Sequence, residues 1–176
     1  MFARRYGSVA ILACGLALLP GLGHAADTAT ANLTGTDGKE IGTVHVTDAP
    51  KGVLLRVEVK GLAPGWHGMH FHEKGVCEAP KFTSAGAHVH TTKPVVHGLL
   101  NANANDAGDL PNLFVASDGT ATVDLYTTLV SLKGEGNRPA LLDADGAALV
   151  IHAKPDDYQT QPIGGSGDRV ACGVIH

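Results

Sequence analysis

The chain has 176 residues, a length typical of one domain that can bury its own hydrophobic core. Aromatic residues make up only 5% of the chain and glycine occurs 23 times, which favours short strands joined by tight turns over packed helices. The formal net charge of −4 at pH 7 argues against nucleic acid as a partner. These properties predict an all-β protein.

Residues 1–25 form a distinct leader. Arg4 and Arg5 precede an apolar run from Val9 to Leu19, and small residues follow as far as Ala25. This pattern is typical of a secretory signal peptide. Its removal would leave 11 of the 13 basic residues against 17 acidic ones, a net charge of −6. Residues 26–176 are then predicted to be one exported, soluble domain, since no later run approaches the ~20 apolar residues of a membrane span.

The cysteines divide between the leader and the mature chain. Cys14 lies in a segment that faintly resembles a lipid-attachment box, but the apolar run continues past it, so we favour export without a lipid anchor. Cys77 and Cys172 remain, in a compartment that permits disulfides, and they are predicted to pair. Such a bridge would close a loop of about 95 residues and contribute about 4 kcal/mol in the chain-entropy model.

The strands are predicted in chain order. Residues 29–62 contain three strands separated by turn signals, and residues 53–59 alternate apolar and polar positions as a half-buried strand does. A fourth strand is predicted over residues 65–72. Residues 73–111 then lack a periodic pattern, and a structureless stretch this long is usually functional.

Strand patterns resume at three places: residues 120–126, 148–152 and 169–174. Eight or so short strands with two long loops predict an eight-stranded antiparallel Greek-key barrel or sandwich of immunoglobulin-like architecture.

The ten histidines are the strongest functional signal. His70 and His72 lie two residues apart on a predicted strand, so their side chains share a face with Cα atoms roughly 6.5 Å apart. Two imidazoles at this spacing can converge on one ion, although a pair of surface histidines is the alternative. Four further histidines follow: His88, His90, His97 and His152. A set this rich in imidazole suits copper and zinc best.

Four segments carry a resemblance to a known family: residues 65–73 (GWHGMHFHE), 84–88 (SAGAH), 108–111 (GDLP) and 167–175 (GDRVACGVI). With them in this order, residues 29–175 resemble the copper/zinc superoxide dismutases, and the exported bacterial branch in particular. The resemblance implies the fold predicted above. It also implies an antioxidant enzyme of the periplasm or the extracellular space that disproportionates superoxide to oxygen and hydrogen peroxide.

By resemblance, the copper ligands are His70, His72, His88 and His152. His88 would bridge copper to zinc as an imidazolate, which is plausible only between two cations that lower the pKa of the ring. Copper would take an electron from one superoxide and give it to a second, with a proton supplied through His88. Arg169 matches the arginine that attracts and orients the anion, a surface arginine being the alternative.

The zinc site departs from the family pattern of three histidines and one aspartate. His88, His97 and Asp109 fit that pattern, but Asp106 stands where the third histidine is expected. Aspartate is a competent zinc ligand. We therefore favour a site of His88, His97, Asp106 and Asp109 over substitution by His90, and over weak or absent zinc binding.

Other residues receive supporting roles. Asp156 matches the carboxylate that links a copper histidine to a zinc histidine, with Asp157 as the alternative. His45 and His67 are expected to be surface or supporting residues outside the metal sites. Lys74 and Lys81 could attract the substrate, but solvated surface lysines are the preferred interpretation.

Two functions are compatible with these residues. The favoured one is the enzyme, and the other is an exported copper-binding or copper-delivery protein of the same fold without turnover. Arg169 favours the enzyme, because a copper store needs no guide for an anion. The pattern does not distinguish a monomer from a homodimer.

Overall fold

A computed structural model describes Met1 and residues 26–176. The predicted signal peptide and Cys14 therefore lie outside the described residues, apart from Met1. Regular structure in the described part is almost entirely strand, with one short 3-10 helix at Thr83–Ala85. No helix among these residues is long and apolar enough to cross a membrane.

Seven strands form one antiparallel sheet in the order β5-β8-β9-β1-β2-β3-β7. Their bounds are β1 Thr28–Gly35, β2 Glu40–Ala49, β3 Gly52–Val59, β5 Met69–His72, β7 Ala121–Thr127, β8 Ala148–His152 and β9 Arg169–Val174. A second sheet pairs β4 (Gly65–His67) with β6 (Leu113–Val115). Neighbours distant in sequence, such as β1 beside β9 and β3 beside β7, reflect Greek-key crossovers. The predicted antiparallel all-β fold is confirmed.

The core follows from the alternation along the strands. In β3, Val53, Leu55 and Val57 are fully buried, whereas Arg56 and Glu58 face outward and form an ion pair with each other. Burial of one face of each strand in this way removes apolar surface from water and stabilises the curled sheet.

The strand predicted over residues 65–72 is interrupted at Gly68. The Gly68 N–H donates to the Lys154 carbonyl and its own carbonyl accepts from the His152 N–H, both at 2.8 Å. A Cβ at residue 68 would stand 2.6 Å from the Ser166 Oγ, so any other residue would require the buried Ser166 side chain to shift. The chain therefore changes sheets here: β4 pairs with β6, and β5 pairs with β8.

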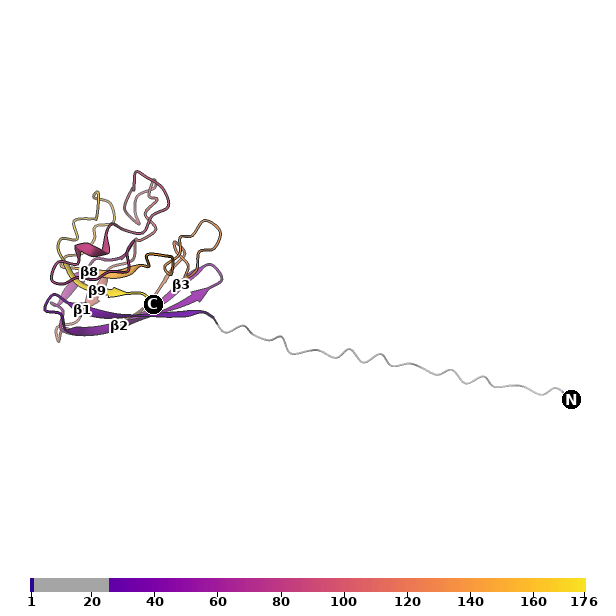
Figure 1. Cartoon of the computed structure of the whole chain (residues 1–176), viewed down its shortest axis with the longest axis horizontal. Helices are drawn as coiled ribbons and strands as arrows, with labels where there is room; N and C mark the ends of the chain where they lie inside the picture. The colour runs from indigo at the N-terminus through magenta and orange to yellow at the C-terminus, as the bar shows by residue number, and fades with distance from the viewer. Residues whose placement is uncertain (2–25) are drawn as a thin grey trace.

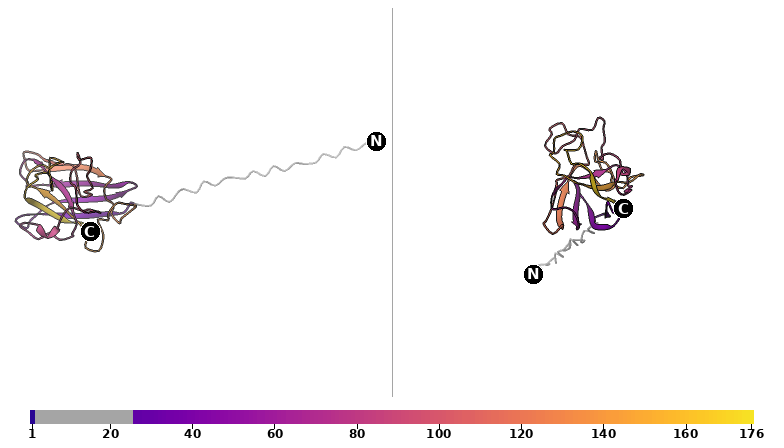
Figure 2. Two further views of the ribbon diagram at one scale, coloured as in Figure 1. Left: turned by 90° about the horizontal axis from the view of Figure 1, so that it is seen from above. Right: turned by 90° about the vertical axis from the view of Figure 1, so that its left-hand side faces the viewer.

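The long connecting segments gather on the side of the molecule away from β1 and β2 (Figure 1, and from other directions in Figure 2). Two parts of the segment after β5 return to it through isolated bridges, His72 with His88 and His70 with Asp109. This return places residues from a segment without periodic pattern directly beside the histidines of β5.

Candidate metal centre

Two strands and one loop bring four histidines together. His70 and His72 lie on β5, with ring centroids 6.5 Å apart. His152 ends β8, the strand paired with β5, and His88 comes from the loop bridged to His72. One candidate ligand atom from each of the four lies within 4.8 Å of the others, and all four side chains are buried.

Each of these rings has one nitrogen that is buried without a hydrogen-bond partner. The unpartnered atoms are His70 Nδ1, His72 Nε2, His88 Nε2 and His152 Nε2. A buried polar atom without a partner costs free energy, and native proteins usually satisfy it. Four such nitrogens on adjacent rings are the arrangement expected where a metal ion completes the site.

The second nitrogen of each ring is held by the protein. His72 Nδ1 donates to the Gly86 carbonyl at 3.0 Å, and His152 Nδ1 donates to the Gly167 carbonyl at 3.1 Å. His70 Nε2 lies 2.8 Å from Asp156 Oδ2. Such bonds fix the tautomer and orientation of a metal-binding histidine.

Three of these rings are kept neutral. Burial lowers the pKa of His72 to about 2, with a further contribution from the nearby His88. Burial lowers the pKa of His152 to about 3, and burial also lowers the pKa of His70. A neutral imidazole is the form that binds a metal, so this side of the centre is prepared for an ion at neutral pH.

A second group of ligand atoms lies on the other side of the His88 ring. His88 Nδ1 is 2.7 Å from Asp106 Oδ2 and 3.6 Å from Asp109 Oδ1. His97 Nδ1 is 3.5 Å from Asp106 Oδ2 and 2.6 Å from Asp109 Oδ1. Donor atoms about 2.0–2.1 Å from a tetrahedral zinc would lie about 3.3 Å from one another. The four nitrogen–oxygen separations, from 2.6 to 3.6 Å, lie near that value.

Both aspartates present one oxygen to this group and are anchored through the other. Asp106 Oδ1 accepts from the Gly108 N–H at 3.0 Å. Asp109 Oδ2 accepts from the Gly98 N–H at 2.7 Å, and its Oδ1 is buried without a hydrogen-bond partner. The two carboxylates therefore play the same structural part, although Asp106 stands where the resemblance implies a histidine.

The carboxylates reverse the effect of burial on the neighbouring rings. Burial acts to lower the pKa of His97, but the adjacent carboxylates of Asp106, Asp109 and Asp156 outweigh it and raise the pKa to about 11. Burial opposed by Asp106 and Asp109 likewise leaves the pKa of His88 raised. Before metal enters, the acidic group is balanced by protonated imidazole.

His70 and His90 also lie near the second group. His70 is within reach of His88, His97 and Asp109, but its Nε2 bonds Asp156 and its free Nδ1 belongs with the first four histidines. His90 Nδ1 donates to the His88 carbonyl at 2.8 Å, whereas Asp106 Oδ2 lies 2.7 Å from the His88 ring nitrogen. Neither His90 nor Asp106 belongs to the two candidate ligand clusters in the described part of the chain.

Asp156 links the two groups. Its carboxylate is fully buried, with Oδ2 2.8 Å from His70 Nε2 and Oδ1 3.0 Å from His97 Nε2. Asp157 instead accepts bonds from the N–H groups of Gln159 and Thr160 at the surface. The structure therefore places Asp156, and not its neighbour, between the rings.

Arg169 is held close to the first group. Its Nη1 donates to the Phe82 carbonyl at 2.6 Å and its Nη2 to the Gly86 carbonyl at 2.7 Å. The same Gly86 oxygen accepts from His72, so the guanidinium and one histidine share an anchor. Cys77 and Cys172 form a disulfide, which confirms that prediction and ties this loop to β9.

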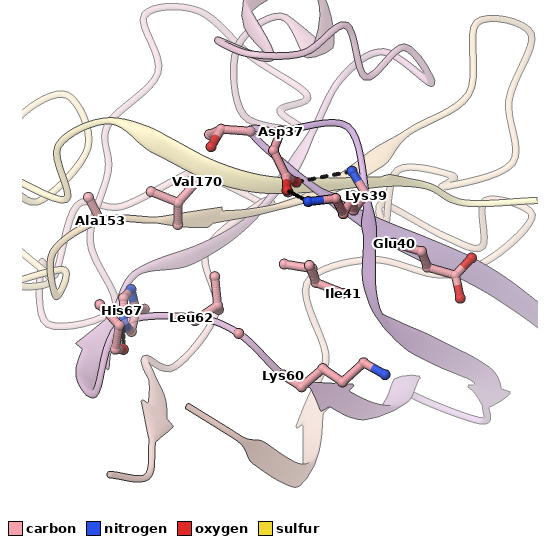
Figure 3. Close-up of a pocket in the computed structure, with 13 residues that line it drawn as sticks. Asp37, Lys39, Glu40, Ile41, Lys60, Leu62, His67, Ala153 and Val170 are labelled. Atoms are coloured by element: carbon pink, nitrogen blue, oxygen red, sulfur yellow. Dashed lines mark hydrogen bonds and ion pairs between the residues drawn. The ribbon is translucent and has the colours of Figure 1, made fainter. Parts of the chain in front are cut away.

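His45 and His67, which are predicted to lie outside the metal sites, differ from each other. His45 is exposed on β2, as expected. His67 is buried with Nδ1 2.6 Å from the His152 carbonyl and Nε2 2.8 Å from the Ala63 carbonyl. It borders a pocket of about 630 Å³ whose walls include Leu62 and Val170 (Figure 3). None of the candidate metal ligands lines this pocket.

Comparison with known proteins decides the family. The family model for "Copper/zinc superoxide dismutase (SODC)" matches residues 40–175. The chain belongs to the copper/zinc superoxide dismutase family. A relative named a Cu-Zn superoxide dismutase, from Caulobacter vibrioides, is 66% identical over 148 residues, which are 84% of this chain and 85% of that protein. A Cu-Zn superoxide dismutase of Aquifex aeolicus is 40% identical over the same shares of the two chains.

Solved structures agree with this assignment. A superoxide dismutase-like protein from Bacillus subtilis superposes with a TM-score of 0.77 at 36% identity, covering 84% of this chain and 97% of that one. The Cu/Zn superoxide dismutase of Brucella abortus gives a TM-score of 0.68 at 29% identity, covering 85% and 100%. The predicted Greek-key fold, enzyme class and pair of metals, copper and zinc, are confirmed for a member of this dismutase family.

Proposed function

We propose that this chain disproportionates superoxide at a copper ion held by four histidines: His70, His72, His88 and His152. The main support is that one nitrogen of each ring is buried without a hydrogen-bond partner. The other nitrogen is held by the protein in His70, His72 and His152, and in His88 it faces Asp106. Four imidazole nitrogens form a donor set that suits copper.

The second ion is assigned to His88, His97, Asp106 and Asp109. The spacing of the four ligand atoms and the matching anchors of the two carboxylates support Asp106 over His90. Two imidazoles and two carboxylates are an acceptable zinc set that carries one more negative charge than three imidazoles and one carboxylate.

His88 is the residue shared by both sites. Its Nε2 faces the copper histidines and its Nδ1 faces Asp106. Bound copper supplies one-electron redox chemistry, while zinc supplies fixed positive charge without redox chemistry. When Nε2 is not engaged with metal, it can hold a proton beside the substrate. That proton is needed to form hydrogen peroxide.

Arg169 provides the anion guide. Two backbone carbonyls hold its guanidinium in one orientation, half-buried and close to His72. A fixed cation at this place attracts and orients superoxide. Because the disulfide joins Cys77 to β9, it maintains the loop whose carbonyls hold Arg169.

The proposal includes export as a single domain of residues 26–176. The Cys77–Cys172 disulfide supports an oxidising compartment, in agreement with the signal peptide predicted from the sequence. We place the mature enzyme in the periplasm or outside the cell, without a lipid anchor at Cys14, and as a monomer or a homodimer.

The test is superoxide decay catalysed by the mature protein loaded with copper and zinc. We expect the wild-type protein to disproportionate superoxide rapidly. The rate should be lost in His70→Ala and strongly reduced in Arg169→Ala. A wild-type protein that binds copper but is no faster than His70→Ala would identify a copper-binding or delivery protein instead.

A further inference from the structure

The Asp156 carboxylate can link the metal sites only if its backbone is held in place. Asp156 lies between β8 and β9, in a stretch without strand pairing. Its two oxygens reach His70 and His97 at 2.8 and 3.0 Å. A shift of a few tenths of an ångström would lengthen one of these bonds at the expense of the other.

The side chain of Asn112 binds the backbone of Asp156 on both sides of its Cα. The Asp156 N–H donates to Asn112 Oδ1 at 2.8 Å, and Asn112 Nδ2 donates to the Asp156 carbonyl at 2.8 Å. A primary amide carries one acceptor and a donor in one plane, so it can replace the paired strand that Asp156 lacks. No sequence pattern singled out Asn112.

Asn112 is itself fixed at both ends. It directly precedes β6, which pairs with β4, and it lies three residues after Asp109. Its backbone N–H donates to the Tyr158 hydroxyl at 2.7 Å, and the Tyr158 N–H donates to Asp156 Oδ1 at 2.6 Å. Four hydrogen bonds therefore link Asn112, Asp156 and Tyr158 in a ring.

We propose that Asn112 is a positioning residue that sets the Asp156 carboxylate between His70 and His97 and thereby couples the copper and zinc sites. This inference rests on the proposed metal sites. Its alternative is that Asn112 merely anchors a surface loop, without effect on the metals.

Asn105 provides a matched control for loop anchoring. Its side chain accepts from the Val96 N–H at 2.8 Å and donates to the Pro94 carbonyl at 3.0 Å and to Thr92 Oγ1 at 3.2 Å. The Asn105 side chain therefore holds a loop with three hydrogen bonds, one more than the Asn112 side chain makes, but it bonds neither Asp156 nor a metal-site ring.

The experiment compares wild type, Asn112→Ala, Asn112→Asp and Asn105→Ala, each loaded with copper and zinc. We expect Asn112→Ala to weaken zinc binding by about 10–100-fold, and to alter the electron paramagnetic resonance spectrum of Cu(II). Asn112→Asp keeps the shape and the acceptor but loses the donor, so a smaller change of both readouts in the same direction is expected. Asn105→Ala loosens the loop next to His97 and Asp106 and can weaken zinc binding, but it should leave the copper spectrum unchanged, because Asn105 does not bond Asp156.

Unchanged zinc affinity and an unchanged copper spectrum in Asn112→Ala would overturn the inference. So would an equal change of the copper spectrum in Asn105→Ala. If Asn112→Ala does not fold, Asn112→Asp decides the question by the same two readouts. Absence of superoxide disproportionation in the metal-loaded wild type would instead refute the proposed function, because that result does not depend on Asn112.

Discussion

Gly164 packs directly against the carboxylate of Asp156. A Cβ at residue 164 would overlap Asp156 Oδ1 and would stand 3.0 Å from His97 Nε2. The adjacent Gly165 has the same left-handed backbone, with φ of +68° against +61°, but no atom lies within 4 Å of the Cβ it would carry. Both glycines are therefore favoured by their backbone conformation, but only at Gly164 would a side chain also collide with Asp156.

Substitution of the two glycines separates backbone strain from damage to the metal sites. Both Gly164→Ala and Gly165→Ala should lower the free energy of unfolding by about 1–2 kcal/mol, because alanine is strained at positive φ. Only Gly164→Ala should also displace Asp156, and zinc affinity should fall by about 10–100-fold. Thermal unfolding and a competitive zinc titration measure the two effects. Equal zinc affinities in the two variants would contradict the expectation.

Asp106 should be an essential zinc ligand. Removing a direct ligand should cost more than removing a supporting residue, so Asp106→Ala should weaken zinc binding by more than about 100-fold. Asp106→His should retain tight binding, because imidazole is also a zinc ligand. Asp118→Asn is a suitable control, since Asp118 bonds only its own turn at Thr120. Retention of full zinc affinity in Asp106→Ala would exclude Asp106 as a ligand.

Proton release should distinguish the two sites. In the metal-free protein the pKa of His88 is raised, and that of His97 is raised to about 11, so the His97 ring carries an extra proton at pH 7. Zinc must displace it, and zinc affinity should rise with pH through the neutral range. The pKa values of His72 and His152 are lowered to about 2 and about 3, so binding to these two rings releases no proton above pH 5.

Calorimetry at pH 7 in buffers of different ionisation enthalpy measures this difference. Zinc uptake should release at least one proton from the metal-free protein. A zinc-binding enthalpy that is independent of the buffer would contradict the assigned protonation states.

The disulfide should stabilise both the fold and the position of Arg169. Cys77 and Cys172 are 95 residues apart in the chain, a separation for which the chain-entropy model gives about 4–5 kcal/mol. The double substitution to serine should lower stability by up to that amount and reduce catalysis by freeing the loop that holds Arg169. Denaturant unfolding and the rate of superoxide decay measure the two effects. Full activity in a destabilised variant would show that the disulfide is not needed to hold Arg169 in place.

Much of the fold could be predicted because apolar and polar residues alternate along a strand that buries only one face. The pattern at residues 53–59 gave β3, and the pattern at 120–126 gave β7, displaced by one residue. The break at Gly68 could not be predicted, because it depends on hydrogen bonds to Lys154 and His152, more than 80 residues away in sequence. The three residues of β6 are too few to show a period.

The candidate site was predictable where chemistry and spacing coincide. The spacing of His70 and His72 on one strand indicated that the two rings can bind the same ion. The other ligands were predicted from the family motifs. Asn112 and the Gly86 carbonyl were missed, since an amide or a backbone oxygen gains its role only when the folded chain brings it to a partner. The replacement of histidine by Asp106 could be noticed in the sequence, but its anchor at Gly108 required the structure.

Anomalous X-ray diffraction from crystals loaded with copper and zinc, recorded at the absorption edge of each metal, locates the two ions and their ligands. We expect a copper peak bound by Nε2 of His88 with His70, His72 and His152, and a separate zinc peak bound by Nδ1 of His88 with His97, Asp106 and Asp109. A single peak shared by both metals, or a zinc ion bound through His90 without Asp106, would contradict it.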